Sequence, residues 1–201
     1  MTAATGTADA SRGWASLQYL CELAKVGVIA AILTGAMVMQ YAYGELPCPL
    51  CLIQRVALFG AALGAILNLR NGFSDRFTGI GLLFATLLLV VSVRQTLLDI
   101  CSRPDHEYVG SAVFGLHMPV WSVLIAFALI VAHVVTLLLP GGRSPHLAAP
   151  SASFPQMAAV AKGLAIYVTV LCAINFVSVF VQCGLGECYT SGYQLLGTVG
   201  R

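Results

Sequence analysis

Charged residues are scarce in this chain, since only 18 of its 201 residues, or 9%, are Asp, Glu, Lys or Arg. An ordinary soluble domain carries about 25%. Apolar residues make up 59% of the chain, and the mean hydropathy is +0.89. So few charges cannot cover the surface of a water-soluble globule. The same composition excludes a chain that is wholly disordered or wholly a coiled coil. A net charge of +2 without a Lys/Arg cluster excludes a nucleic-acid partner.

Long apolar runs are what the sequence has instead, and they predict an all-α integral membrane protein. Each run has 17 to 25 residues, the length that a helix needs to cross the hydrocarbon core. No alternating pattern suggests a barrel, and an isolated strand would leave backbone groups unpaired in lipid. The predicted spans are Val26–Tyr43, Cys51–Leu69, Phe77–Val93, Val120–Leu139 and Met157–Val181.

Lys and Arg are distributed unequally between the two sides of these spans. Six cations fall on the side of the N-terminus: Arg12, Lys25, Arg70, Arg76, Arg143 and Lys162. Three fall on the other side: Arg94, Arg103 and Arg201. The positive-inside rule therefore predicts a cytoplasmic N-terminus and a C-terminus outside.

Composition also divides the chain. Residues 1–22 are predicted to form a disordered cytoplasmic tail, because the first part is polar and small and lacks a signal-peptide pattern. Residues 23–140 hold four spans and predict a four-helix transmembrane bundle. Residues 141–156 are rich in Gly, Pro, Ser and Ala and read as a flexible linker. Residues 157–201 add a fifth helix and an external tail that contains cysteine.

Five of the seven cysteines fall on the predicted outer side, which is the oxidising compartment in a bacterium. They are Cys48, Cys51, Cys101, Cys183 and Cys188. Cysteines gathered there are candidates for cycling through disulfides. Cys172 and Cys21 are instead interpreted as small apolar residues of the core. Cys183 and Cys188 fit a static staple of the tail as well as a redox role.

Cys48 and Cys51 form a Cys-Pro-Leu-Cys motif at the start of the second span. Two cysteines at this spacing share a helix face and can close a small disulfide ring. A helix N-terminus favours the thiolate, which is the reactive form. The main alternative is half of a zinc site, but structural zinc usually takes four ligands and no second CxxC follows, so no metal is expected.

Arg55 lies four residues after Cys51, one turn deeper on the same helix face. A cation inside a span is costly and usually functional, although a long side chain can also snorkel to the interface. Its negatively charged partner is expected to be the Cys51 thiolate or the oxygen of a reduced quinone.

These residues resemble the signature of the DsbB family, the bacterial inner-membrane disulfide-forming oxidases. The resemblance rests on Leu46-Pro-Cys-Pro-Leu-Cys-Leu-Ile-Gln-Arg55, in its place after the first span. Val93-Arg-Gln95 and Val113-Phe-Gly-Leu-His-Met-Pro-Val-Trp121 are weaker matches. The likeness covers roughly residues 25 to 139.

The resemblance implies a multi-pass protein of the inner membrane that reoxidises a periplasmic thioredoxin-like dithiol oxidase (DsbA-like). Electrons would pass to a membrane quinone, ubiquinone or menaquinone, through Cys48 and Cys51. By the same similarity, Cys51 would contact the quinone and Arg55 would stabilise the developing charge. Arg94 and Gln95 are further candidates for the quinone site.

The chain departs from the family pattern in its outer cysteines. The third loop of the family usually carries a second cysteine pair that exchanges with the partner, whereas here it holds Cys101 alone. We therefore expect the Cys183–Cys188 tail to supply the missing thiol chemistry, with Cys101 as the attacking thiol or a relay. A vitamin K epoxide reductase-like enzyme and a non-enzymatic scaffold or small transporter stay open as alternatives.

Overall fold

The computed structural model describes residues 3–100, 112–113, 115–138, 153–184, 186, 188 and 192–197, with side chains from Gly13 onward and not those of residues 112 and 113. Within them the chain is almost entirely helical. The helices are α1 (Ala3–Ala42), α2 (Pro49–Asn71), α3 (Asp75–Ile100), α4 (Met118–Leu138) and α7 (Pro155–Cys183). A two-residue hairpin, β1 (Ala112–Val113) and β2 (Leu116–His117), precedes α4, and a 3-10 turn, η2 (Gln194–Leu196), follows α7.

All five predicted spans are confirmed as helices that are long and apolar enough to cross a membrane. Large apolar side chains such as Leu83, Phe127 and Phe176 are exposed on the outside of the bundle. Polar side chains such as Gln40, Asn68 and Asn175 are buried within it. This inverted pattern suits lipid, where a polar group needs a partner from a neighbouring helix.

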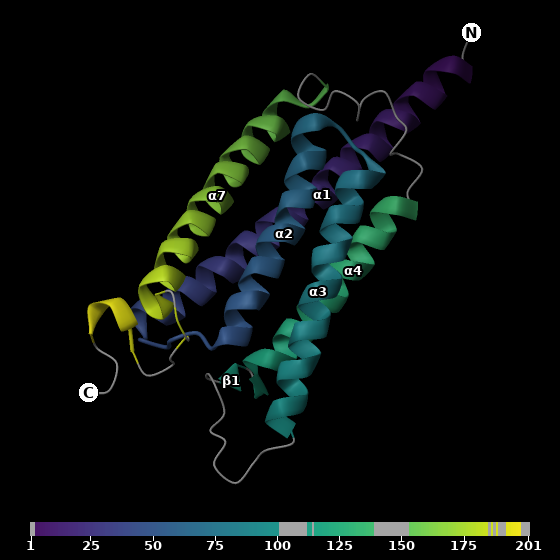
Figure 1. Cartoon of the computed structure of the whole chain (residues 1–201). Helices are drawn as coiled ribbons and strands as arrows, with labels where there is room; N and C mark the ends of the chain where they lie inside the picture. The colour runs from purple at the N-terminus through teal and green to yellow at the C-terminus, as the bar shows by residue number, and fades with distance from the viewer. Residues whose placement is uncertain are drawn as a thin grey trace.

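The helix α2 is the centre of the bundle. It packs against α3 and α1, and α7 covers the side of α2 away from α3 and α4 (Figure 1). Gly64 of α2 meets the backbone of Gly81 of α3 so closely that a Cβ at Gly64 would collide with it. Small residues at such a crossing let helix backbones approach, as is common in membrane bundles.

The helix α1 differs from the expectation of a disordered tail over residues 1–22, because it begins at Ala3. Ala15, Tyr19 and Glu22 are completely buried. Glu22 accepts a hydrogen bond of 2.6 Å from Lys25, which also donates to the Thr136 hydroxyl of α4 at 3.1 Å. Polar residues one helical turn apart thus face the bundle, which explains why the helix continues beyond the apolar run. The predicted linker 141–156 falls largely outside the described residues.

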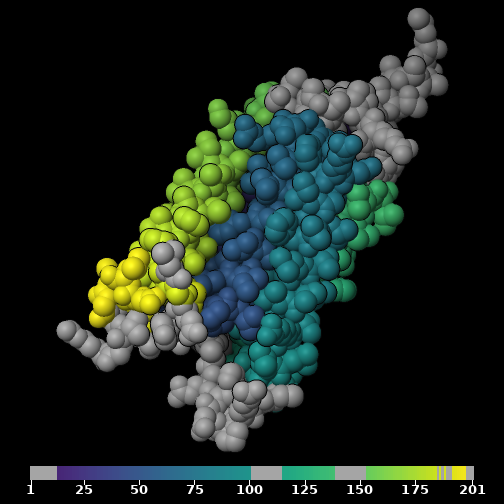
Figure 2. All heavy atoms as spheres, in the orientation of Figure 1, coloured from purple at the N-terminus to yellow at the C-terminus, as the bar shows by residue number. Residues whose placement is uncertain are grey.

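One end of the bundle gathers the features that the sequence singled out. The end of α1, the start of α2, the end of α3, the hairpin, the end of α7 and η2 all lie there (Figure 1). η2 packs against the end of α7 at this end of the bundle (Figure 2). The other end carries the α2–α3 turn, the end of α4 and the start of α7.

Candidate active site

Cys48 and Cys51 lie where α2 begins. Pro49 occupies the first turn, where its missing N–H costs nothing, and Cys48 caps the helix by accepting a hydrogen bond from the Cys51 backbone N–H at 3.2 Å. Both cysteines are free; Cys48 is buried and Cys51 is half-buried. The cap therefore fixes both sulfur atoms at the positive end of the helix dipole.

A chain of amide side chains positions the two sulfurs. Gln95 of α3 donates from Nε2 to the Cys51 Sγ at 3.5 Å and to the Cys48 Sγ at 3.6 Å. Its Oε1 accepts from Gln54 Nε2 at 2.9 Å, and Gln54 Oε1 accepts from the Ser122 hydroxyl of α4 at 3.3 Å. Three helices thus orient one donor at the motif.

The two cysteines are not equivalent. The hydrogen bond that Cys48 shares with the Cys51 side chain raises the pKa of the Cys48 thiol, and burial raises it further. The protonated form of Cys48 is thus favoured. Cys51 lines the cavity described below.

Arg55 is only 8% exposed and is held by neutral groups. Its Nη1 donates to Gln40 Oε1 of α1 at 2.6 Å and to Asn175 Oδ1 of α7 at 3.2 Å, and its Nη2 donates to the Ala36 carbonyl at 3.2 Å. No described carboxylate forms an ion pair with Arg55. Because its charge is oriented but not paired, an anion beside it would gain from the interaction.

A cavity of about 560 Å³ lies between α1, α2 and α4 at this end of the bundle. Its walls are mostly apolar, and Trp121 of α4 contributes an aromatic ring. Cys51 and Arg55 both line it, one helical turn apart. Its other linings are Ile32, Gly35, Ala36, Met39, Glu45, Leu46, Pro47, Gln54, Leu58, Met118, Ser122 and Ile125. An apolar cavity with a few convergent polar groups is the usual form of a small-molecule site.

Of the two further cofactor candidates, the structure brings one to the cysteine motif. Gln95 is buried and contacts both sulfurs, whereas Arg94 is exposed, and neither residue is among those that line the cavity. Both residues lie within α3, which continues to Ile100 instead of ending at Val93. Consecutive helix residues point about 100° apart, so only one of the two can face α2.

The remaining cysteines divide into those that approach the motif and those that do not. A disulfide joins Cys183, the last residue of α7, to Cys188. Cys101 lies outside the described residues. Cys172 was expected in the core, but it is exposed on the outer face of α7, where the surrounding side chains are also apolar. Cys21 is half-buried in α1.

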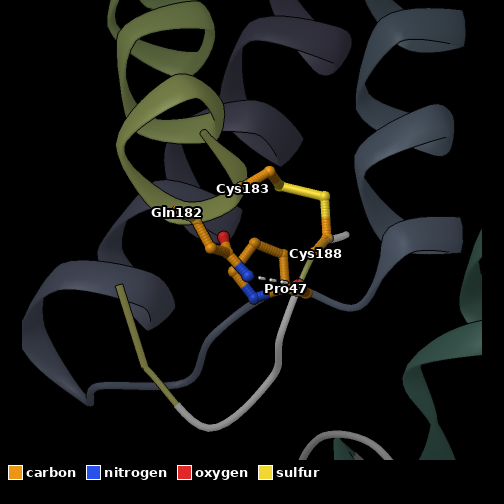
Figure 3. Close-up of a disulfide and its surroundings, with 4 residues drawn as sticks. All are labelled: Pro47, Gln182, Cys183 and Cys188. Atoms are coloured by element: carbon orange, nitrogen blue, oxygen red, sulfur yellow. Dashed lines mark hydrogen bonds between the residues drawn. A yellow bond between two sulfur atoms is a disulfide. The ribbon is translucent and has the colours of Figure 1, made fainter. Parts of the chain in front are cut away.

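The Cys183–Cys188 disulfide lies beside the motif. Gln182 Nε2 donates to the Pro47 carbonyl at 3.0 Å, and Pro47 directly precedes Cys48. Figure 3 shows the Gln182 amide directed at Pro47, with Cys188 next to the proline. The fifth helix therefore ends against the loop that carries the first motif cysteine.

Sequence reasoning missed the residues that hold Arg55. Gln40 and Asn175 lie 15 and 120 positions from it, so no local pattern connects them. The available signal was the presence of amide side chains inside apolar spans. Such residues rarely enter lipid without a partner, and both face the same cation.

The chain was then compared with known proteins. A family model described as "Disulfide bond formation protein DsbB" matches residues 19–136, more than half of the chain. The match includes the motif, Arg55 and Gln95 but ends before α7. No solved structure matches the chain.

Curated relatives carry the same description. A "Disulfide bond formation protein B" from Chromohalobacter salexigens is 36% identical over 108 residues, which cover 48% of this chain and 61% of the relative. One from Burkholderia thailandensis is 33% identical over 144 residues, which cover 56% of this chain and 84% of the relative. A "Disulfide bond formation protein B 1" from Pseudomonas fluorescens is 35% identical over 102 residues, with 48% and 50% covered. The chain thus spans between half and two thirds of two of these relatives.

Proposed function

Because the chain belongs to the DsbB family of disulfide bond formation proteins, we propose that it is a membrane thiol:quinone oxidoreductase. It regenerates the disulfide of a periplasmic thioredoxin-like dithiol oxidase of the DsbA type and delivers the electrons to ubiquinone or menaquinone. The observation that carries this proposal is that Cys51 and Arg55 line the same apolar cavity, which a lipid-soluble acceptor can enter.

The cavity fits a quinone in its chemistry. A quinone ring is flat and apolar and carries two carbonyl oxygens. When the ring accepts two electrons, these oxygens gain negative charge. Apolar walls and Trp121 would hold the ring, and Arg55 would face an oxygen. Arg55 is suited to this role because Gln40, Asn175 and Ala36 fix its guanidinium without neutralising it.

The motif residues do the thiol chemistry. An incoming thiolate attacks the Cys48 sulfur of the oxidised pair, forms a mixed disulfide and releases the Cys51 thiolate. The second thiol of the donor then resolves the mixed disulfide, so that the donor leaves oxidised and both motif cysteines are reduced, with two electrons for the quinone. Gln95 donates to the sulfur atoms and so stabilises the charge on Cys51, while Arg55 adds its positive charge one turn away. The raised pKa of the Cys48 thiol favours its protonated form once the pair is reduced.

The proposed location is the bacterial inner membrane, with the motif end of the bundle toward the periplasm and the N-terminus in the cytoplasm. The distribution of Lys and Arg supports this orientation. The thiol donor is then aqueous and the acceptor lipid-soluble, and the motif end of the bundle is where both can meet.

The test is quinone reduction by the full chain in lipid nanodiscs, followed by the absorbance of the quinone, with a reduced DsbA-type protein as donor. Cys51→Ser removes the thiolate, and we expect turnover to fall to background. Cys172→Ser, on the exposed face of α7, is the matched control and should keep the turnover of the parent protein. Full turnover in Cys51→Ser would contradict the proposal, and turnover at background in the parent protein would favour a scaffold.

A further inference from the structure

Two cysteine pairs lie at the same end of the bundle, and one buried hydrogen bond joins their neighbouring residues. Gln182, which is fully buried, precedes Cys183 and donates to the carbonyl of Pro47, which precedes Cys48 (Figure 3). We propose that Cys183–Cys188 is a second redox pair, through which electrons from the partner protein reach Cys48–Cys51. This inference rests on the proposed function and assigns the entry site of its electrons to the added helix.

The exposure of the four sulfur-bearing residues sets the direction of transfer. Cys188 is half-buried, as is Cys51, which opens onto the apolar cavity, whereas Cys183 is 5% and Cys48 is 8% exposed. A thiolate of another protein can therefore reach Cys188 but not Cys48. Cys183 is buried as the last residue of α7, and Gln182 beside it contacts the motif loop at Pro47. Cys188 is thus the receiving sulfur, and Cys183 is the one that transfers to Cys48.

The exchange balances without a further reagent. A partner thiolate attacks Cys188, forms a mixed disulfide and releases the Cys183 thiolate. Cys183 then attacks Cys48 of the oxidised motif, which releases the Cys51 thiolate. The second partner thiol resolves the mixed disulfide at Cys188, so the partner leaves oxidised. The Cys188 thiolate then attacks Cys183, which restores the Cys183–Cys188 disulfide and leaves Cys48 and Cys51 reduced, with two electrons for the quinone.

Residues of the segment that follows α7 form hydrogen bonds with the helices around Arg55. Tyr193 accepts a hydrogen bond of 3.4 Å from Gln40, and the same Gln40 holds Arg55. Gly184 turns the chain with a φ of +59°, which favours glycine, and its N–H closes the end of α7 on the Phe180 carbonyl. Position is thus fixed on both sides of the Cys183–Cys188 loop.

A static staple is the weaker explanation of this disulfide. The stabilisation from a cross-link grows with the length of the loop it closes, and these cysteines are only five positions apart. The helix α7 is already held at the motif by Gln182 and Asn175. The Cys183–Cys188 disulfide therefore adds little constraint to a helix end that is already anchored. Because it lies next to the motif thiols, thiol–disulfide exchange explains it better than stabilisation does.

The test traps the transfer intermediate. In the full-length double variant Cys51→Ser and Cys188→Ser, neither resolving thiol remains, so a Cys48–Cys183 disulfide should accumulate in a glutathione redox buffer. Acid quenching, alkylation and peptide mass mapping identify the pair without any quinone. Cys172, on the same helix but exposed on its outer face, is an internal control and should stay alkylated.

A second variant tests positioning. Gln182→Leu removes the hydrogen bond to Pro47, and we expect the Cys48–Cys183 disulfide to form about five-fold more slowly in the same background, the effect of one lost hydrogen bond. Phe180→Leu, half-exposed in the last turns of α7, is the matched control and should not change the rate.

A Cys48–Cys101 disulfide in place of Cys48–Cys183, or no disulfide at Cys48, would overturn the inference. Either result leaves the proposed quinone reaction intact, because the mapping involves no quinone. Failure of the proposed function shows separately, as full quinone reduction by Cys51→Ser.

Discussion

Arg55 and Lys25 are both cations buried in the helical bundle, and they are held in opposite ways. Lys25 forms an ion pair of 2.6 Å with Glu22 and donates to Thr136, so the cluster is neutral. Arg55 donates only to uncharged acceptors, chiefly Gln40 and Asn175. The first charge is satisfied within the fold, while the second is oriented and left for an anion.

The difference separates a structural cation from a functional one. An intramembrane charge is costly, and the protein offsets this cost for Lys25 by supplying a carboxylate on the same helix. For Arg55, the amides of Gln40 and Asn175 orient the guanidinium without neutralising it. Arg55 and Cys51, one helical turn apart, line the same cavity. Changes at Lys25 should therefore affect stability, and changes around Arg55 should affect chemistry.

The largest expected effect is on stability, at Lys25. Lys25→Met leaves Glu22 buried without its partner, and we expect the free energy of unfolding to fall by about 3–5 kcal/mol. The measurement is equilibrium unfolding in mixed detergent micelles. The double variant Glu22→Gln with Lys25→Met removes both charges and should regain most of the loss. If the single variant were as stable as the parent protein, the ion pair would not be the reason for this cluster.

Arg55 should show the next largest effect, on rate. Among the described residues that line the cavity, Arg55 is the one with a positive charge, and Arg55→Met removes it. We therefore expect turnover at saturating quinone to fall about 10²- to 10³-fold. Arg55→Lys keeps the charge but loses the planar guanidinium that binds Gln40 and Ala36. Its turnover should therefore lie between that of Arg55→Met and that of the parent protein. Equal turnover in Arg55→Met and the parent protein would place Arg55 with Lys25 as a structural cation.

Gln95 should give the smallest effect, because it contributes neutral hydrogen bonds. Gln95→Leu removes the donor to both sulfur atoms, a loss of about 1 kcal/mol, so alkylation of the reduced motif by iodoacetamide should slow about five-fold. Arg94→Leu changes the exposed neighbour and should leave the alkylation rate as it is. Slower alkylation in Arg94→Leu than in Gln95→Leu would restore the expectation that Arg94 belongs to the site.

The parts of the fold that could be predicted are those encoded in contiguous residues. The five spans follow from apolar runs, and the place of Cys48 and Cys51 at a helix start follows from Pro49 and from their spacing. The extension of α1 was missed because its inward side chains, among them Gln18, Glu22 and Lys25, are polar and resemble a solvated tail until their partners on α4 are known.

The parts that could not be predicted depend on pairing between distant helices. The choice of Gln95 over Arg94 depends on which face of α3 meets α2, and two adjacent polar residues give no preference. The exposure of Cys172 was missed because every face of α7 is rich in apolar residues, so composition does not separate core from lipid.

The contact between Arg55 and Asn175 also has a consequence for the order in which the molecule is assembled. Gln40 precedes Arg55 by 15 residues, so it has already been synthesised when the arginine enters the membrane. Asn175 follows 120 residues later, which at about 5–20 residues per second is a delay of roughly 6–24 s. During that interval the guanidinium depends on α1 alone. The fifth helix then docks on a half-formed binding site, and its insertion completes the set of amides that holds the charge.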